Sequence, residues 1–179
     1  GSSLALVKLV RVETWKRLQI SDPPNIKNIN SKSSQPIMKL THHGAHEGVT
    51  GSCHQLNWGD KHGLLVDCGI FQGNEARKHP NPEINFSLAN IESLLLTHVH
   101  IDHAGRLPYL LAAGFEQPIY CSYPTAKLLP LVMEDALKIG FTRSRKLISK
   151  FLKQVKHLLR PVEYDSWQQI PGSASIRLR

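Results

Sequence analysis

The six residues His98-Val99-His100-Ile101-Asp102-His103, called the metal segment below, hold four side chains of the kinds that bind metal ions. They directly follow the apolar run Ser93-Leu94-Leu95-Leu96-Thr97, which is typical of a buried strand. Side chains along a strand alternate between its two faces, so His98 and His100 leave the strand on the same side. Two imidazoles placed in this way can bind one ion.

The second half of the metal segment is predicted to turn toward a second ion. Proline is tolerated only in the first turn of a helix, so Pro108 predicts a helix that starts near Gly105. Asp102 and His103 then lie in the connecting loop. Zinc binds imidazole nitrogen and carboxylate oxygen at about 2.0 to 2.2 Å, and paired metals in hydrolases lie about 3.5 to 4 Å apart. The spacing therefore predicts a binuclear metal hydrolase.

The metal ligands predicted from this pattern are His98, His100, Asp102 and His103, and the last two are also predicted to be catalytic. The alternative is a polar loop in which Asp102 caps a helix. At the frequencies of His and Asp in this chain, the pattern arises by chance about once in a thousand such sequences. Three histidines have no role in capping, so the metal site is favoured.

Three further stretches carry a resemblance to a known family: Gly44-Ala45-His46-Glu47-Gly48-Val49-Thr50-Gly51-Ser52, Leu64-Leu65-Val66-Asp67-Cys68-Gly69-Ile70-Phe71-Gln72-Gly73 and Gly105-Arg106-Leu107-Pro108. Together with the metal segment they resemble the β-CASP group of RNA-processing nucleases in the metallo-β-lactamase superfamily. That group includes the cleavage and polyadenylation endonuclease subunit and related bacterial proteins. The resemblance begins at about Met38. It implies an α/β fold, the leading half of an αββα sandwich, and phosphodiester hydrolysis by two zinc ions.

The resemblance also implies which parts of the site this chain holds. In the family, the residue that matches Asp67 supports the metal ligands, where a carboxylate orients imidazoles; a turn Asp before Gly69 is the alternative. Family members continue with a Gly-His motif, a bridging Asp, another His and an inserted β-CASP domain, and none of these precedes Arg179. One zinc ion or none is therefore expected in this chain alone, together with little or no nuclease activity.

Other histidines and the cysteines are expected to be structural. His157 lies in a cationic helical stretch rather than in a Gly-His context. The loose cluster of His42, His43, His46 and His54 lacks the spacing of a metal site, and the family does not use it. The three cysteines, Cys53, Cys68 and Cys121, are odd in number and lack ligand spacing, so they are predicted to be reduced core residues of a cytoplasmic protein.

Positive charge is concentrated near the end of the chain. Residues 138–179 hold 10 Lys or Arg against 2 Asp or Glu, whereas residues 38–137 hold 6 against 10. Apolar and cationic residues alternate with helical spacing over 143–160, which predicts an amphipathic helix with a positive face. Arg143, Lys146, Lys150 and Lys153 are the residues of this face predicted to contact nucleic acid, and RNA is the candidate partner. A solvated helix face and an anionic membrane surface are the alternatives. No stretch has the length of a membrane span.

The chain is predicted to have two parts. Residues 1–37 form an N-terminal extension and linker, with a strand or helix over 4–20, and residues 38–179 form a partial metallo-β-lactamase-like domain. Helices are expected at 124–139 and 143–159, and strands at 38–43, 52–58, 63–67, 93–97, 118–121, 161–164 and 174–178. Half a sandwich would expose an apolar sheet face. The partner is therefore predicted to be a second copy in a homodimer, with residues 4–20 exchanged, or a complementing chain.

Three functions from different classes remain open. The first is the N-terminal portion of a zinc-dependent RNA nuclease. The second is a truncated, non-catalytic module for nucleic-acid binding or assembly, which the basic helix favours. The third is a small-substrate metallo-hydrolase of the same superfamily, and the stretches Val49-Thr50-Gly51-Ser52 and Phe71-Gln72-Gly73 count against it.

Overall fold

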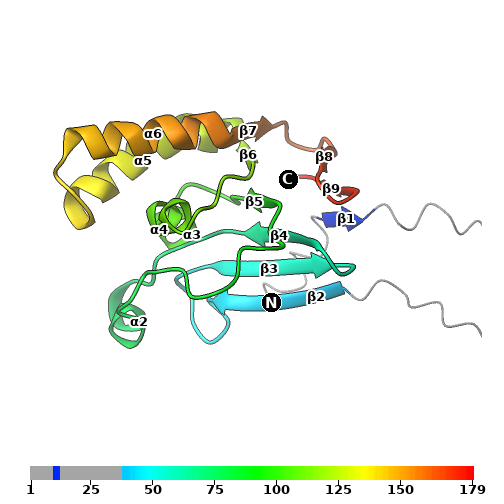
Figure 1. Cartoon of the computed structure of the whole chain (residues 1–179), viewed down its shortest axis with the longest axis horizontal. Helices are drawn as coiled ribbons and strands as arrows, with labels where there is room; N and C mark the ends of the chain where they lie inside the picture. The colour runs from blue at the N-terminus through cyan, green and yellow to red at the C-terminus, as the bar shows by residue number, and fades with distance from the viewer. Residues whose placement is uncertain (1–9, 13–37) are drawn as a thin grey trace, which may run out of the picture.

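The structure is a computed structural model that describes residues 10–12 and 38–179. The predicted linker at 21–36 lies outside the described residues, as does most of the element predicted over 4–20. In the described part, the strands form a six-stranded sheet and a three-stranded sheet. Figure 1 shows the two longest helices side by side along one side of the larger sheet. The metal segment lies between this helical layer and the antiparallel end of the sheet.

The larger sheet has the strand order β2-β3-β4-β5-β6-β7. Pairing is antiparallel from β2 to β4 and parallel from β4 to β7. Parallel strands are covered on both faces, which explains why β4 and β5 are buried at nearly every position. The strands are β2 Met38–Gly44, β3 Cys53–Trp58, β4 His62–Val66, β5 Ser93–Leu95, β6 Ile119–Ser122 and β7 Leu159–Val162.

Helices follow the strands as α2 Gly73–Lys78, α3 Ile101–Ala104, α4 Leu107–Ala112, α5 Tyr123–Gly140 and α6 Arg145–Leu158. The starts of α5 and α6 are set by serine caps. The Ser122 hydroxyl accepts from the backbone N–H of Thr125, and Ser144 plays the same part for Leu147. Proline in the first turn also favours the start of α4 and of α5. Backbone N–H groups in the first turn of a helix have no acceptor within the helix, so proline, which lacks this group, loses no hydrogen bond there.

Alternate side chains of the central strands enter two separate cores. Leu65, Leu94 and Ile119 pack against helices α4, α5 and α6 on one face of the sheet. Leu64, Leu95 and Tyr120 enter a second core on the other face. That core is completed by β8 Gln168–Ile170 and β9 Ala174–Ile176, which form the smaller sheet with β1 Val10–Val12. The central strands of the larger sheet are therefore covered on both faces within one chain.

This second core corrects one expectation drawn from the sequence. The homodimer was predicted because half a sandwich would leave a sheet face bare, but the small sheet of β1, β9 and β8 packs there. β1 pairs with β9 of the same chain, in antiparallel register from Val10 with Ile176 to Val12 with Ala174. An uncovered sheet face thus gives no reason for a dimer.

The predicted strands and the two long helices are present with end shifts of a few residues, but the surroundings of the metal segment differ. Asp102 and His103 lie in the short helix α3, not in a loop. His100 is extended and its carbonyl accepts the backbone N–H groups of both His103 and Ala104, at 2.9 Å each. This turn forms before Gly105, so the prediction from Pro108 located only the second helix, α4. Strand β8 and helix α2 were not predicted.

Within residues 10–12 and 38–179, no helix is both long enough and apolar enough to cross a membrane.

Candidate metal centre

The metal segment follows β5 and ends inside α3. The backbone N–H of Leu96 still donates to Tyr120 of β6 at 2.8 Å, and Leu96 is fully buried. The chain then leaves the sheet, and its three imidazoles gather. Nε2 of His98 lies 3.1 Å from Nδ1 of His100, and the ring centres of His98 and His103 are 3.9 Å apart. The structure therefore brings together the three histidines that the sequence singled out.

His103 is oriented by Asp67, which lies directly after β4. Its Nδ1 is 2.7 Å from Oδ2 of Asp67. A carboxylate only accepts hydrogen bonds, so Nδ1 carries the proton and Nε2 is left with its lone pair. That Nε2 lies 3.6 Å from Oδ2 of Asp102. The second pair of predicted ligands therefore has its free donor atoms side by side.

Asp67 is buried, with 2% of its side chain exposed, and is bonded on several sides. Its carboxylate accepts from Ser52 Oγ at 3.0 Å and from the Thr97 backbone N–H at 2.8 Å, in addition to His103. Its φ of 59° is in the left-handed region, which Asp tolerates better than most residues. Asp67 therefore both occupies a turn and contacts His103, so the two alternatives given for it from the sequence apply together. Sequence reasoning missed Ser52 and Thr97 as its partners, although both lie in or beside the quoted stretches.

The short helix α3 is held through its backbone by two loops that are distant in sequence. The N–H of Ser52 donates to the carbonyl of Asp102 at 2.8 Å, and the N–H of Cys68 donates to that of His103 at 2.7 Å. The N–H of Gly69 in turn donates to Ser52 at 2.8 Å. Two of the three stretches that carry the family resemblance, 44–52 and 64–73, thus support the metal segment.

The electrostatic surroundings shift the pKa values of His98 and His103 in opposite directions. Burial lowers the pKa of His98, and the nearby His103 lowers it further. Burial also acts to lower the pKa of His103, but the hydrogen bond and charge of Asp67, with the charge of Asp102, outweigh it and raise this pKa. Neutral imidazole is the form that binds metal, so His98 is ready to bind at neutral pH.

The donor atoms fit metal ligation as two pairs. Two ligands at about 2.0 to 2.1 Å from one tetrahedral zinc ion lie about 3.3 Å apart. The separations of 3.1 Å between His98 and His100 and 3.6 Å between Asp102 and His103 lie on either side of this value. Across the described ranges, however, no group of three or more His, Cys, Asp or Glu side chains is arranged to hold an ion. Each pair would supply only part of a four-ligand shell.

The remaining histidines of the β2–β3 hairpin have partners of their own. His42 and His54 face each other across the two strands, with their Nδ1 atoms 2.8 Å apart. His43 contacts Gln55 through Nε2 at 2.8 Å and stacks on Phe86. The three cysteines are free thiols and buried, as predicted.

The four cations predicted to contact nucleic acid do not line one common groove. All four, Arg143, Lys146, Lys150 and Lys153, are exposed. Lys153 lines a groove between α5 and α6, whereas Lys150 lines a different, more apolar groove between α4 and α6. His157 is exposed on α6, and its carbonyl accepts a hydrogen bond from the guanidinium of Arg160 at 2.8 Å.

The sequence of this chain matches a known protein family. The sequence profile of the Metallo-beta-lactamase superfamily matches residues 47–174, which include the metal segment, the 64–73 stretch and the end of the 44–52 stretch. The chain belongs to this superfamily. Membership confirms the α/β fold class predicted from the sequence and implies a site for metal ions.

Three relatives indicate the branch of the superfamily to which the chain is similar. A ribonuclease of Thermus thermophilus is 37% identical over 139 residues, which are 78% of this chain and 31% of that protein. Transcription termination factor FttA of Methanothermobacter thermautotrophicus is 32% identical, over 68% of this chain and 20% of that protein. Integrator complex subunit 11 of Danio rerio is 33% identical, over 79% of this chain and 25% of that protein. These relatives support the RNA-processing nuclease branch, and the chain spans about a third or less of their length.

Proposed function

We propose that this chain is the N-terminal portion of a zinc-dependent RNA nuclease and holds half of its two-metal site. The observation that carries the proposal is the pairing of donor atoms at the end of β5, His98 with His100 and Asp102 with His103. The relatives named as a ribonuclease, a termination factor and an Integrator subunit support RNA as the substrate class.

Each residue has a distinct part in the proposed chemistry. His98 Nε2 and His100 Nδ1 would hold one ion, and Asp102 Oδ2 and His103 Nε2 would hold the other. Bound ions of this kind lower the pKa of a shared water and stabilise the charge that develops during in-line displacement at phosphorus. Asp67 keeps the proton of His103 on Nδ1, so that Nε2 stays available toward Asp102.

The donor pairs limit what this chain does by itself. Because no described group of three or more such side chains is arranged around an ion, we expect weak or single zinc occupancy. Little or no nuclease activity is expected from this chain alone. A complementing polypeptide that supplies a bridging carboxylate and further histidines would restore both.

Zinc content tests the ligand assignment. We expect the purified chain to bind zinc in a competition titration, and His98→Ala and Asp102→Ala to weaken that binding by at least about 100-fold. Loss of a group that merely orients a ligand costs about 10- to 100-fold, so loss of a ligand is expected to cost no less. His157→Ala is the matched control, because this exposed histidine lies on α6 outside the metal segment. Equal zinc affinity in all four proteins would contradict the assignment.

A second candidate function is a non-catalytic nucleic-acid-binding module, which the cations on α6 favour. The two candidates differ in whether bound RNA is cleaved when zinc is supplied in excess.

A homodimer or a complementing chain remains a prediction, and light scattering at micromolar concentration measures the oligomeric state. A cytoplasmic location, which three buried free thiols favour, belongs to the same proposal.

A further inference from the structure

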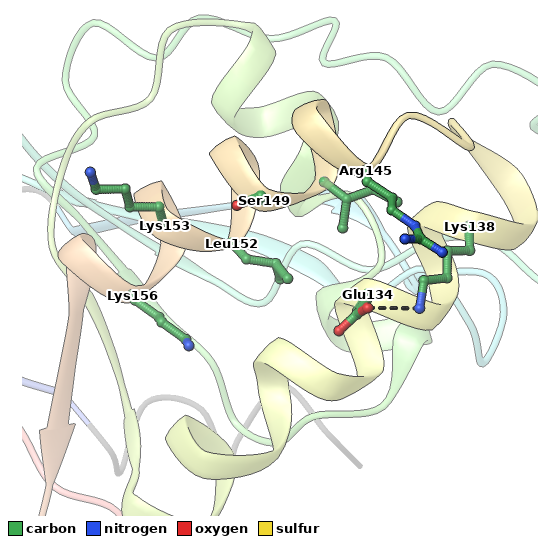
Figure 2. A pocket seen from close by; sticks show the side chains of 8 residues that line it. Glu134, Lys138, Arg145, Ser149, Leu152, Lys153 and Lys156 are labelled. Carbon is green, nitrogen blue, oxygen red and sulfur yellow. Dashed lines mark ion pairs between the residues drawn. The ribbon is translucent and has the colours of Figure 1, made fainter.

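A groove of about 720 Å³ runs between α5 and α6 and is lined largely by cationic side chains (Figure 2). Figure 2 shows Arg145 close to Lys138 at one end and Lys153 and Lys156 toward the other, with Leu152 between them. The lining residues are Glu134, Lys138, Arg145, Ile148, Ser149, Leu152, Lys153 and Lys156. This surface is separate from the metal segment, none of whose residues lines it.

Most of the positive charge of the groove has no ion-pair partner among the residues that the structure describes. Lys138 is paired with Glu134 at 2.7 Å, and this pair lowers the pKa of the glutamate. Among the ion pairs of the described residues, none involves Arg145, Lys153 or Lys156. All three are exposed, and α6 contains no Asp or Glu. Within residues 10–12 and 38–179, the groove therefore presents three exposed cations that form no ion pair.

The spacing of these cations suits an extended polyanion. Arg145, Ser149 and Lys153 recur at intervals of four residues, so they lie along one face of α6. With a rise of 1.5 Å per residue, Arg145 and Lys153 are separated by about 12 Å along the helix axis. This length is greater than the size of one phosphate group, so the row can follow the backbone of an extended strand past more than one phosphate. A compact anion would reach only one end of such a row.

The floor of the groove adds a contact that a purely electrostatic surface lacks. Ile148 is buried beneath it, and Leu152 is half-buried along it. Grooves that hold single strands combine cations that follow the backbone with apolar or aromatic surface for the bases and sugars. We propose that the α5–α6 groove binds the phosphate backbone of a single-stranded RNA segment through Arg145, Lys153 and Lys156. The choice of RNA over another polyanion rests on the proposed function.

This assignment differs from the set expected from the sequence. Arg143, Lys146 and Lys150 belong to the same basic stretch but do not line the groove. They therefore supply a control that matches the groove residues in number, in charge and in exposure. If binding depended only on the summed charge of the helix, both triplets would matter equally.

The test measures binding of the chain to a fluorescent oligouridylate of 12 nucleotides by anisotropy, in EDTA, over a range of salt concentrations. The groove variant is Arg145→Gln/Lys153→Gln/Lys156→Gln, and the control is Arg143→Gln/Lys146→Gln/Lys150→Gln. We expect the groove variant to bind at least 10-fold more weakly at 50 mM salt and the control less than 3-fold. For single strands each phosphate contact contributes about 0.7 to the salt slope, so the groove variant is expected to lower it by about 2.

Equal losses in the two variants, or no measurable binding by the unmodified chain at 50 mM salt, would overturn the proposal. So would tighter, groove-dependent binding to vesicles that contain phosphatidylserine, because that result identifies a membrane as the ligand. Circular dichroism checks that both variants fold. EDTA removes any role of metal, so this binding measurement does not depend on the metal segment. Failure of the groove and failure of the metal site are therefore distinguishable.

Discussion

Gly69→Ala is expected to destabilise the protein by at least about 3 kcal/mol, at the upper end of what overpacking costs. A Cβ at this position would lie 1.6 Å from the carbonyl oxygen of Asp102 and 2.7 Å from the backbone nitrogen of His103. Both atoms belong to the backbone of α3, so no flexible side chain can move aside. The loop and the metal segment must separate, and the bonds from Ser52 and Cys68 to α3 are strained with them. Urea unfolding followed by tryptophan fluorescence measures the change.

Gly140→Ala is the matched control for this substitution. Nothing lies within 4 Å of a Cβ built on Gly140, which is the last residue of α5. Alanine in a helix is preferred to glycine by roughly 0.5 to 1 kcal/mol, so this variant is expected to be neutral or slightly more stable. A Gly69→Ala protein with the unfolding midpoint of the unmodified chain would show that α3 is not held against the 67–70 loop as described.

The strands and the long helices were predictable because their signals are local. Leu64 to Val66 and Ser93 to Leu95 form apolar runs, and Pro108 marks the first turn of α4. The gathering of His98, His100 and His103 followed from the period of a strand and from one tight turn. In each of these cases, the residues that decide the structure are neighbours in the sequence.

The support of the metal segment was not predictable in the same way. Backbone hydrogen bonds join Ser52 to Asp102 and Cys68 to His103 across as many as 50 residues, and backbone groups carry no sequence signal. The small sheet escaped prediction for a similar reason, since β8 is three residues long and pairs only within that sheet. The first α3 turn was missed because the carbonyl of His100, rather than a polar side chain, accepts the bonds that begin it.

The groove between α5 and α6 shows a related limit of sequence reasoning. Helical spacing predicted a cationic face correctly but could not decide which cations would lie beside the next helix. That choice is made by Ile148 and Val155, whose burial fixes the rotation of α6 against the sheet and α5. Arg145 and Lys156 then line the groove, and Lys146 does not.

Asp67→Ala is expected to cost about 3 to 5 kcal/mol, the amount typical of removing one partner of a buried ion pair. The variant leaves the hydroxyl of Ser52, the backbone N–H of Thr97 and the imidazole of His103 without their acceptor. Zinc affinity is expected to fall as well, by about 10- to 100-fold, because Nδ1 of His103 is no longer held. Thermal unfolding in EDTA measures the first effect without a contribution from metal, and zinc competition measures the second.

Ser52→Ala separates the part of Asp67 in the fold from its part in orienting His103. This variant removes one hydrogen bond to the same carboxylate, so it is expected to cost about 1 kcal/mol and to leave zinc affinity within about 3-fold of the unmodified chain. Asp67→Asn keeps the size of the side chain and tolerates a φ of 59°, but its amide offers one acceptor oxygen instead of two. Its stability is expected to lie between those of Ser52→Ala and Asp67→Ala. If Asp67→Ala costs no more than Ser52→Ala and binds zinc as tightly, then Asp67 only shapes a turn, and His103 is positioned by the backbone of α3 alone.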